Sequence, residues 1–286
     1  MKIGYLQFKP ELGKANQNTE KVESFISGEN FDLIVIPELA NSGYLFNEKE
    51  DLKKVSENPE TGKYCNMLKR LSKEKKAYIV SGFCESAKED NKEVFYNSSI
   101  LVFPDGEYRI YRKTHLFFNE KKFFKPGNTG FWVYDISNKK FGTVKLGMMV
   151  CFDWIFPESA RTLALRGADI ICHPANLVMP YCQNAMFTRA LENRVYTITA
   201  NRVGTDLNGG ESLEFTGESV IVSPAGEYLS RASADKEEIF FTTVNPELSR
   251  NKCINEKNNM FEDRRELFYF KNTKNCLLYT SPSPRD

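Results

Sequence analysis

Two runs of consecutive apolar residues constrain the fold of this chain more than any other feature. Residues 32–37 are DLIVIP and residues 168–172 are ADIIC, and apolar and polar positions do not alternate in either. This pattern is typical of strands in a parallel sheet that is covered on both faces. Apolar residues at helical spacing lie near these runs, at 17–27, 61–76 and 157–166. Strands that alternate with helices predict an α/β fold.

The remaining apolar segments fit the same plan. A further helix is predicted at 184–195, and further strands at 2–8, 77–84, 96–103, 107–112, 143–150, 196–202, 217–223 and 239–244. Pro104-Asp105-Gly106 is a turn signal, which predicts a hairpin between the two strands that flank it. No linker, short repeat or low-complexity segment interrupts the chain before residue 276. We therefore expect one domain over residues 1–275.

The C-terminal segment 276–286, CLLYTSPSPRD, does not look like the rest of the chain. It matches the translation of a commonly used transposon-end sequencing adaptor. We expect this tail to be non-native and exclude it from the fold.

Composition and charge exclude several classes of function. Lys and Arg total 39 and Asp and Glu total 38, so the net charge is +1. This balance gives no electrostatic reason to expect a nucleic acid or an anionic membrane as a partner. No window approaches 18 consecutive apolar residues, so no transmembrane helix is predicted. The apolar N-terminal stretch is too short for a signal peptide, and seven cysteines then indicate a cytoplasmic protein.

The cysteines and histidines do not form a metal-binding pattern. No pair of cysteines has Cys-x-x-Cys spacing, and only His115 and His173 could add an imidazole. A zinc site is therefore not predicted, and we expect no metal and no cofactor. Two histidines also leave few candidates for a Ser–His or Cys–His hydrolase.

A reactive side chain stands at the C-terminal end of three predicted strands. Glu38, Lys113 and Cys151 each follow such a strand directly. Ligands of α/β sheets bind beyond the carboxyl ends of the strands, so a carboxylate, an ammonium and a thiol can converge there. Each residue also has a simpler interpretation when taken alone. Glu38 would be a loop carboxylate, Lys113 a surface lysine and Cys151 an inert buried thiol.

The sequences around these three residues favour the catalytic interpretation. They are IPELANSGY (36–44), YRKTHLF (111–117) and VCFDWIFPESARTLALRGADI (150–170), followed by HPANL (173–177), RALENR (189–194), FTGES (215–219) and DRREL (263–267). Together they closely resemble the nitrilase superfamily of carbon–nitrogen hydrolases, from Lys2 to about residue 270. Within the superfamily, the chain looks most like archaeal-type nitrilases and aliphatic amidases.

The resemblance implies a fold, a set of site residues and an assembly. The fold is a four-layer α-β-β-α sandwich built from two βα halves. Glu38 matches the general base, Lys113 the electrostatic stabiliser and Cys151 the nucleophile, and Glu120 matches a further carboxylate beside them. Members usually pair through helices that flank the active site, so at least a homodimer is expected. The segments implied in that contact are 157–166, 184–195 and 246–270.

The implied chemistry is nucleophilic hydrolysis through a thioester. Cys151 attacks the carbon of an amide or nitrile while Glu38 takes the thiol proton. An ammonium and the backbone N–H of Phe152 offset the charge that develops on the substrate. Glu38 then protonates the leaving nitrogen, and a water molecule hydrolyses the thioester. This scheme needs no histidine and no metal. A Cys151–His173 dyad is the alternative mechanism, and otherwise His115 and His173 are structural.

The expected pocket indicates the class of substrate. Its candidate substrate-binding residues are aromatic, apolar or small and polar, without arginine: Tyr44, Phe117, Phe152, Trp154 and Asn176, with Leu177, Met179 and Tyr181 as further walls. They predict small, uncharged, mostly aliphatic nitriles or amides. Cys151 is followed by Phe-Asp, which is commoner among amidases and carbamoyl hydrolases than among true nitrilases, although archaeal-type nitrilases share it. Cys182 is expected in a loop near the pocket.

Three other functions stay open at this stage. An N-carbamoyl amine hydrolase would release carbon dioxide as well as ammonia. An acyl or amide transferase would pass the thioester to an amine instead of to water. A non-catalytic binding protein on the same fold would have no use for the retained Glu38, Lys113 and Cys151.

Overall fold

The structure is a computed structural model that describes residues 1–269. Contacts group the chain into two units, Met1–Asn251 and the part from Lys252 onward. The first unit contains every strand and α-helix of the described residues. In the second, a β-bridge pairs Cys253 with Asn259, and a 3₁₀ turn follows at Glu266–Phe268. The tail predicted at 276–286 lies outside the described residues.

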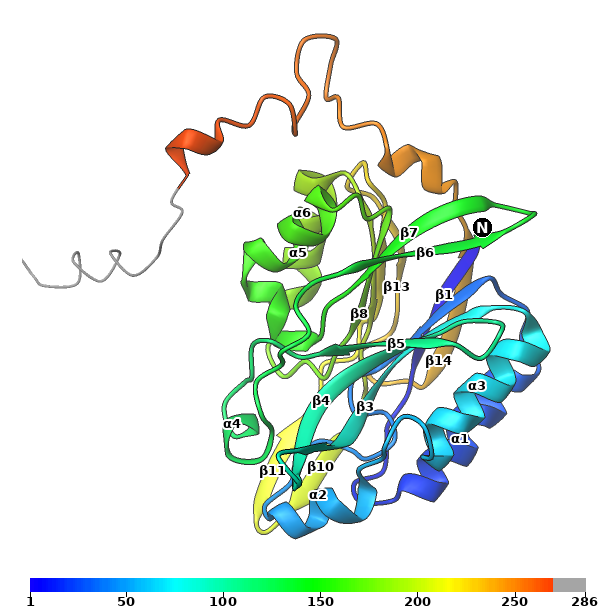
Figure 1. The fold of residues 1–286 in the computed structure, drawn as a ribbon, viewed down its shortest axis with the longest axis vertical. Coiled ribbons are helices and arrows are strands. Elements are labelled where there is room, and N and C mark those ends of the chain that lie inside the picture. Colours follow the sequence, from blue (N-terminus) through cyan, green and yellow to red (C-terminus); the bar gives the residue numbers. More distant parts are fainter. Residues whose placement is uncertain (270–286) are drawn as a thin grey trace, which may run out of the picture. The chain divides into compact units, whose positions relative to one another are not determined.

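One six-stranded sheet is built mainly from the first half of the chain (Figure 1). Its strands, in spatial order, are β14 (Glu238–Thr243), β1 (Lys2–Gln7), β2 (Leu33–Ile36), β3 (Tyr78–Glu89), β4 (Lys92–Val102) and β5 (Tyr108–Arg112). Strands β1, β2 and β3 are parallel, and β4 and β5 continue as antiparallel hairpins, so β5 points the same way as β2. The hairpin predicted at Pro104-Asp105-Gly106 is therefore confirmed. Strand β14 arrives from the far end of the unit and pairs antiparallel with β1.

The second six-stranded sheet repeats this arrangement with the second half of the chain. Its strands, in spatial order, are β13 (Tyr228–Arg231), β12 (Val220–Val222), β9 (Tyr196–Ala200), β8 (Ile170–Pro174), β7 (Gly142–Met148) and β6 (Val133–Asn138). Strands β7, β8 and β9 are parallel, and the flanking strands are antiparallel. The two βα halves expected from the sequence are thus present.

Helices cover the outer face of each sheet. The first sheet carries α1 (Ala15–Ser27) and α3 (Lys63–Lys75), and the second carries α5 (Pro157–Leu165) and α6 (Cys182–Asn193), as Figure 1 shows. The inner faces meet where β1 and β2 contact β9 and where β2 and β3 contact β8. The predicted four-layer α-β-β-α sandwich is therefore confirmed.

Strand β2 shows why its sequence is apolar without alternation. Ile34 and Ile36 belong to the cluster that packs against the helices α1 and α3. Leu33 and Val35 point to the opposite face, because side chains alternate along a strand, and there the second sheet covers them. All four side chains are fully buried. Each such burial contributes about 1.5–3 kcal/mol to folding.

Several short elements carry no clear signal in the sequence. They are the helices α2 (Lys49–Val55) and α4 (Glu120–Phe123), and the separate hairpin of β10 (Thr205–Asn208) and β11 (Glu211–Glu214). Strands β6 and β13 were not predicted either. Within residues 1–269, no helix has both the length and the apolar character needed to cross a membrane.

Candidate active site

Glu38, Lys113 and Cys151 meet at one edge of the two sheets. Glu38 follows β2 and Lys113 follows β5, and these two strands point the same way, so both residues leave the first sheet at the same edge. Cys151 comes shortly after β7 in the second sheet. Glu38 and Lys113 are in direct contact there, with Nζ 2.7 Å from Oε1. Burial and the charges of both residues act on the pKa of the Cys151 thiol.

The segment that carries Glu38 lies directly on β3. A Cβ atom at Gly82 would stand 2.3 Å from the Cα of Glu38, so only glycine permits this approach. Gly82 donates its N–H to the carbonyl of Pro37 and accepts from the N–H of Ala40, both at 3.1 Å. Leu39 then adopts a φ of 48°, a left-handed conformation that is costly for any residue other than glycine. This backbone fixes the direction in which the Glu38 side chain leaves the sheet.

Lys113 joins two carboxylates in a buried cluster. Its Nζ donates to Oε1 of Glu38 at 2.7 Å and to Oε1 of Glu120 at 2.8 Å. Asn97, in β4, donates from Nδ2 to the same Glu38 oxygen at 2.6 Å. The other oxygen, Oε2 of Glu38, has no hydrogen-bond partner among the described residues. One carboxylate oxygen is therefore paired with the ammonium, and the other is left available to accept a proton.

Burial dominates the protonation chemistry of this cluster. It raises the pKa of Glu38, an effect opposed by the Lys113 charge and increased by the Glu120 charge. Burial alone would lower the pKa of Lys113, but the charges of Glu120 and Glu38 outweigh it and raise that pKa. Burial also raises the pKa of Cys151 well above its ordinary value. The resting thiol is thus protonated near neutral pH, and it needs a neighbouring base to become a nucleophile.

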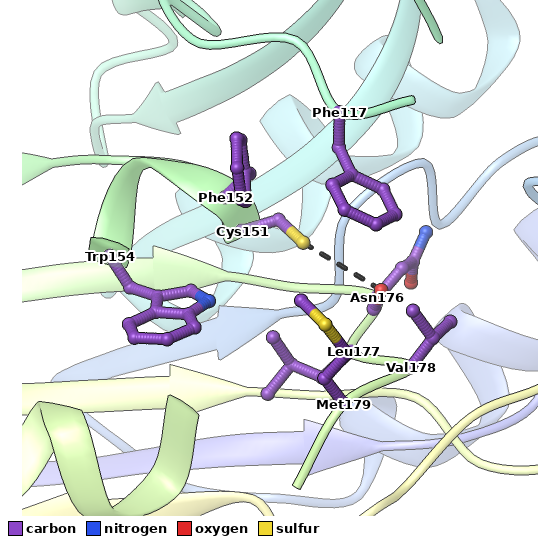
Figure 2. Close-up of a pocket in the computed structure, with 8 residues that line it drawn as sticks. All are labelled: Phe117, Cys151, Phe152, Trp154, Asn176, Leu177, Val178 and Met179. Carbon is purple, nitrogen blue, oxygen red and sulfur yellow. Dashed lines mark hydrogen bonds between the residues drawn. The ribbon is translucent and has the colours of Figure 1, made fainter. Parts of the chain in front are cut away.

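Cys151 lies at a sharp turn. Its φ is 42°, and it begins the short 3₁₀ helix η1 (Cys151–Ile155). Asp153 closes this turn, because its Oδ2 accepts the backbone N–H of Val150 at 2.8 Å. The thiol lies 3.6 Å from the backbone carbonyl oxygen of Asn176, the contact drawn as a dashed line in Figure 2. The turn thus directs the sulfur toward the segment that follows β8.

Asp153 also holds the segment that carries Lys113. Its Oδ1 accepts from Nδ1 of His115 at 2.7 Å and from the His115 backbone N–H at 3.2 Å. Its Oδ2 accepts the hydroxyl of Tyr111 at 2.6 Å. The His115 ring stacks on Phe156 with centroids 3.8 Å apart. Since Lys113 lies between Tyr111 and His115 in the chain, one buried carboxylate connects the lysine segment to the nucleophile turn.

Both ring nitrogens of His173 already have hydrogen-bond partners. Its Nε2 lies 2.9 Å from the carbonyl oxygen of Cys151, which can only accept, so Nε2 donates. Its Nδ1 lies 3.1 Å from Oγ1 of Thr199 and accepts from it. Burial lowers the pKa of His173 to about 4, so the ring is neutral near pH 7. Neither ring nitrogen is left for the thiol, and this geometry disfavours the alternative Cys151–His173 dyad.

A narrow cavity of about 20 Å³ adjoins the Cys151 sulfur. Figure 2 shows its lining: Phe117, Cys151, Phe152, Trp154, Asn176, Leu177, Val178 and Met179. Four of the five predicted substrate-binding residues are therefore among its walls. Both amide atoms of the Asn176 side chain are buried and lack a hydrogen-bond partner in the described part of the chain. The cavity is thus apolar apart from one amide that is available to a ligand.

Two of the predicted pocket residues are not among the cavity walls, and one cysteine lies in a different element from the one predicted. Tyr44 is not among the cavity walls, and its hydroxyl donates to Oε1 of Glu120 at 2.6 Å. Tyr181 is 61% exposed and is also absent from the cavity lining. The prediction that Cys182 lies in a loop was wrong, because it is the first residue of α6 and is fully buried.

Sequence reasoning missed Asn97 and Asp153 as parts of the site. Asn97 forms a chance glycosylation-like triplet with Ser98 and Ser99, which gave no reason to single it out. All three are buried in β4, and polar residues buried within a strand usually have a specific partner. That rule was the available signal for Asn97.

Comparisons with known proteins show the family and the fold of this chain. A family model described as carbon–nitrogen hydrolase matches residues 2–252. A nitrilase from Pyrococcus abyssi is 45% identical over 274 residues, which cover 95% of this chain and all of the relative. A probable nitrilase from Schizosaccharomyces pombe is 34% identical, with 85% of this chain and 88% of the relative covered. The crystal structure of an amidase from Nesterenkonia sp. superimposes with a TM-score of 0.74 at 24% identity, over 93% of this chain and 94% of that one.

The chain belongs to the carbon–nitrogen hydrolase family, and it is a hydrolase that acts on C–N bonds. Within the nitrilase superfamily it is of the archaeal type. The Nesterenkonia structure supports the fold alone.

Proposed function

We propose that the chain hydrolyses small, uncharged aliphatic nitriles or amides to a carboxylic acid and ammonia, through a thioester on Cys151. The main support is that Oε2 of Glu38 has no hydrogen-bond partner in the described residues and lies in a buried cluster near the protonated Cys151 thiol. Lys113 and Asn97 bind only the other oxygen. Because burial raises the pKa of Glu38, this carboxylate is a stronger base toward the thiol than an ordinary glutamate.

The steps follow from these positions. Glu38 takes the Sγ proton as the sulfur attacks the amide carbon, and the C=O electron pair moves to oxygen. When the C=O bond re-forms, the C–N bond breaks and Glu38 gives its proton to the departing amine. Glu38 next deprotonates a water molecule that attacks the thioester. The C–S bond then breaks, and the proton returns to the thiolate. A nitrile first forms a thioimidate, to which water adds before ammonia leaves.

Lys113 and Glu120 have supporting roles in this proposal. The Lys113 ammonium is fixed between the two carboxylates and stabilises negative charge that develops on the substrate. Glu120 holds Lys113 in place from the other side. The backbone N–H of Phe152 is the proposed second donor to the substrate oxygen or nitrogen.

The cavity supports the proposed substrate class. Phe117, Trp154 and Leu177 offer apolar contact, and no charged side chain is among the lining residues. The unpartnered amide of Asn176 can bind a neutral polar group of the substrate. The small volume favours short acyl chains, since a cavity of this size holds about one water-sized group before its walls must move.

A substrate panel tests the proposal. Propionitrile, propionamide and N-carbamoyl propylamine are each assayed for ammonia, and intact-protein mass spectrometry identifies the adduct trapped on the enzyme. We expect ammonia from the nitrile or the amide and a propionyl mass on Cys151. Cys151→Ala removes turnover and adduct, whereas Cys65→Ala, which deletes a buried thiol of α3, keeps both. Turnover by Cys151→Ala refutes the assignment of the nucleophile.

The same panel separates the alternative reactions. Ammonia and carbon dioxide from the N-carbamoyl compound alone would replace the proposed substrate by a carbamoyl amine. Hydroxamate formation that outruns acid formation when hydroxylamine is added would indicate acyl transfer. If no substrate turns over and iodoacetamide modifies Cys151 no faster than free cysteine, the proposal of an activated nucleophile fails.

We also propose a homodimer that uses the surface near α5 and α6. Leu165 in α5 and Leu191 in α6 are 42% and 40% exposed, and Ile155 in the adjoining η1 is 42% exposed. Apolar side chains on neighbouring elements are typical of a surface that a partner covers. Light scattering is expected to give twice the mass of the chain or more, and a monomer mass contradicts this proposal.

A further inference from the structure

Tyr44 connects the catalytic cluster to a part of the molecule outside both six-stranded sheets. Its hydroxyl donates to Oε1 of Glu120 at 2.6 Å, and the same oxygen accepts from Nζ of Lys113 at 2.8 Å. The other oxygen of Glu120 accepts the backbone N–H of Phe117 at 3.2 Å. The position of the Tyr44 hydroxyl therefore helps to determine where Glu120 holds the lysine.

The backbone of Tyr44 is in turn held by Asp206. Its Oδ2 accepts the N–H of Tyr44 at 3.0 Å and the N–H of Leu45 at 3.2 Å. Asp206 lies in β10, which belongs to the separate two-stranded hairpin. A carboxylate remote in sequence thus fixes the loop from which Tyr44 reaches Glu120.

Arg202 fixes Asp206 itself. Its guanidinium donates to both carboxylate oxygens, at 2.7 and 2.9 Å, and both side chains are almost completely buried. The guanidinium also lies 3.9 Å from the centroid of the Phe215 ring, which packs edge-on against the Tyr44 ring with centroids 5.8 Å apart. The tyrosine is therefore supported at its backbone and at its ring by one buried ion pair.

A buried ion pair is weak evidence for stability, because the loss of hydration offsets the attraction between the charges. The effect of this ion pair on geometry is better defined. Asp206 holds the loop that carries Tyr44, and the hydroxyl of Tyr44 is the only phenol shown bonded to Glu120 within residues 1–269.

We propose that Asp206, held by Arg202, is a positioning residue of the active site that acts through the hydroxyl of Tyr44 on Glu120 and Lys113. This inference deepens the proposed function and rests on it. Neither Asp206 nor Tyr44 exchanges a proton with the substrate in this scheme. They set the orientation of Glu120, which sets the position of the ammonium.

Tyr44→Phe tests the last link, because it removes only the hydroxyl. We expect kcat to fall about tenfold or more, as a small displacement of a catalytic group produces, with little change in KM. The acid limb of the kcat/KM profile moves to higher pH, since a displaced Lys113 ammonium lowers the pKa of Glu38 less than it does now. Tyr5→Phe is the matched control: it removes a hydroxyl that is bonded to Ser230, away from the site. An equal effect of the two substitutions on kcat and on the pH profile overturns the proposal.

Asp206→Asn tests the first link. Its effect on kcat should not add to that of Tyr44→Phe in the double variant, because both act through the same hydroxyl. Additive losses show that Asp206 does not act through Tyr44. Arg202→Met with Asp206→Asn removes the charge of both partners, so a variant that fails to fold because of one unpaired charge is avoided.

A readout that needs no turnover separates this inference from the proposed function. The rate of alkylation of Cys151 by iodoacetamide, measured across pH by mass spectrometry, reports the charges around the thiol. Tyr44→Phe should shift this profile and Tyr5→Phe should not. If no nitrile or amide is hydrolysed but the shift is present, the positioning network stands and the substrate proposal fails. An unshifted profile in an active enzyme rejects the network.

Discussion

His115 Nδ1 lies 2.7 Å from Oδ1 of Asp153, and this contact ties the two loops of the site to each other. The histidine belongs to the segment after Lys113, and the aspartate follows Cys151 by two residues. The position of the Lys113 ammonium relative to the Cys151 thiol therefore depends on a contact between two other residues, His115 and Asp153.

Asp153→Asn is expected to weaken both stability and activity. Asparagine has an NH₂ donor in place of one carboxylate oxygen. At least one of the N–H groups that now donate to Asp153 therefore loses its acceptor. Such a loss costs about 1–3 kcal/mol in a buried site. We expect a lower Tm and, well below that Tm, a kcat reduced about tenfold or more. A lower Tm with unchanged kcat would show that Asp153 only closes its own turn.

Asn97→Leu is expected to move the acid limb of the kcat/KM profile to higher pH. Glu38 must be ionised to take the thiol proton, so activity is lost as pH falls through its pKa. Burial has already raised that pKa above 4.5, and the Asn97 hydrogen bond counteracts part of the rise. Removal of the donor therefore raises the pKa of Glu38 further. A pH–rate profile measures the shift, and an unmoved limb contradicts the assignment of Glu38 as base.

His173→Gln is expected to reduce the pH dependence of stability below neutrality. Burial lowers the pKa of His173 to about 4, whereas the unfolded chain has an ordinary value near 6.5. Between these values the unfolded state binds more protons, so the free energy of unfolding falls as pH falls, by about 3 kcal/mol in full. This contribution is complete above pH 6.5 and is lost toward pH 4.

Urea unfolding between pH 4.5 and 7 measures this difference. Glutamine keeps a donor for the Cys151 carbonyl but does not titrate, so the curve for His173→Gln should be flatter than that of the unsubstituted protein. Parallel curves for the two proteins would show that His173 does not contribute to the pH dependence.

Leu177→Ala is expected to shift substrate preference toward longer acyl chains. Leu177 is 3% exposed and forms part of the cavity wall, so its truncation enlarges the space beside the sulfur. One methylene in an apolar pocket changes kcat/KM by about 10-fold to 200-fold. The ratio of kcat/KM for pentanamide over propionamide should rise about tenfold or more. Leu207→Ala, at a position 72% exposed in β10, serves as the control and should leave the ratio unchanged.

Much of the fold followed from periodicity. The two apolar runs became β2 and β8, central strands of the two sheets, and the four main helices lie within a few residues of their predicted limits. The pairing of strands that are distant in sequence was harder to predict. Residues 239–244 have the pattern of a strand, but nothing in that pattern indicates that the strand lies beside β1. Register between distant segments depends on packing that a local window does not contain.

The site residues also fall into those that local sequence predicts and those that depend on long-range contacts. Glu38, Lys113 and Cys151 were found because each follows a strand, and the position of a strand's end can be predicted locally. Asn97 lies within a strand and faces Glu38 only because β4 pairs with β3, which in turn pairs with β2, the strand before Glu38. Its role therefore depends on strand pairing. Tyr44 was predicted as a pocket wall from its aromatic character, while the partner of its hydroxyl depends on the loop that Asp206 holds.

The place of β14 has a consequence for how the protein is made. This strand is the outer neighbour of β1, and the N-terminal ammonium donates to the carbonyl of Val244 at 2.9 Å. During synthesis the N-terminal half leaves the ribosome first, yet the sheet that carries Glu38 is not complete until residues 238–243 have emerged. Until then β1 presents an open edge to other chains in the cell. The nascent chain is therefore most exposed to aggregation through this edge before β14 pairs with β1.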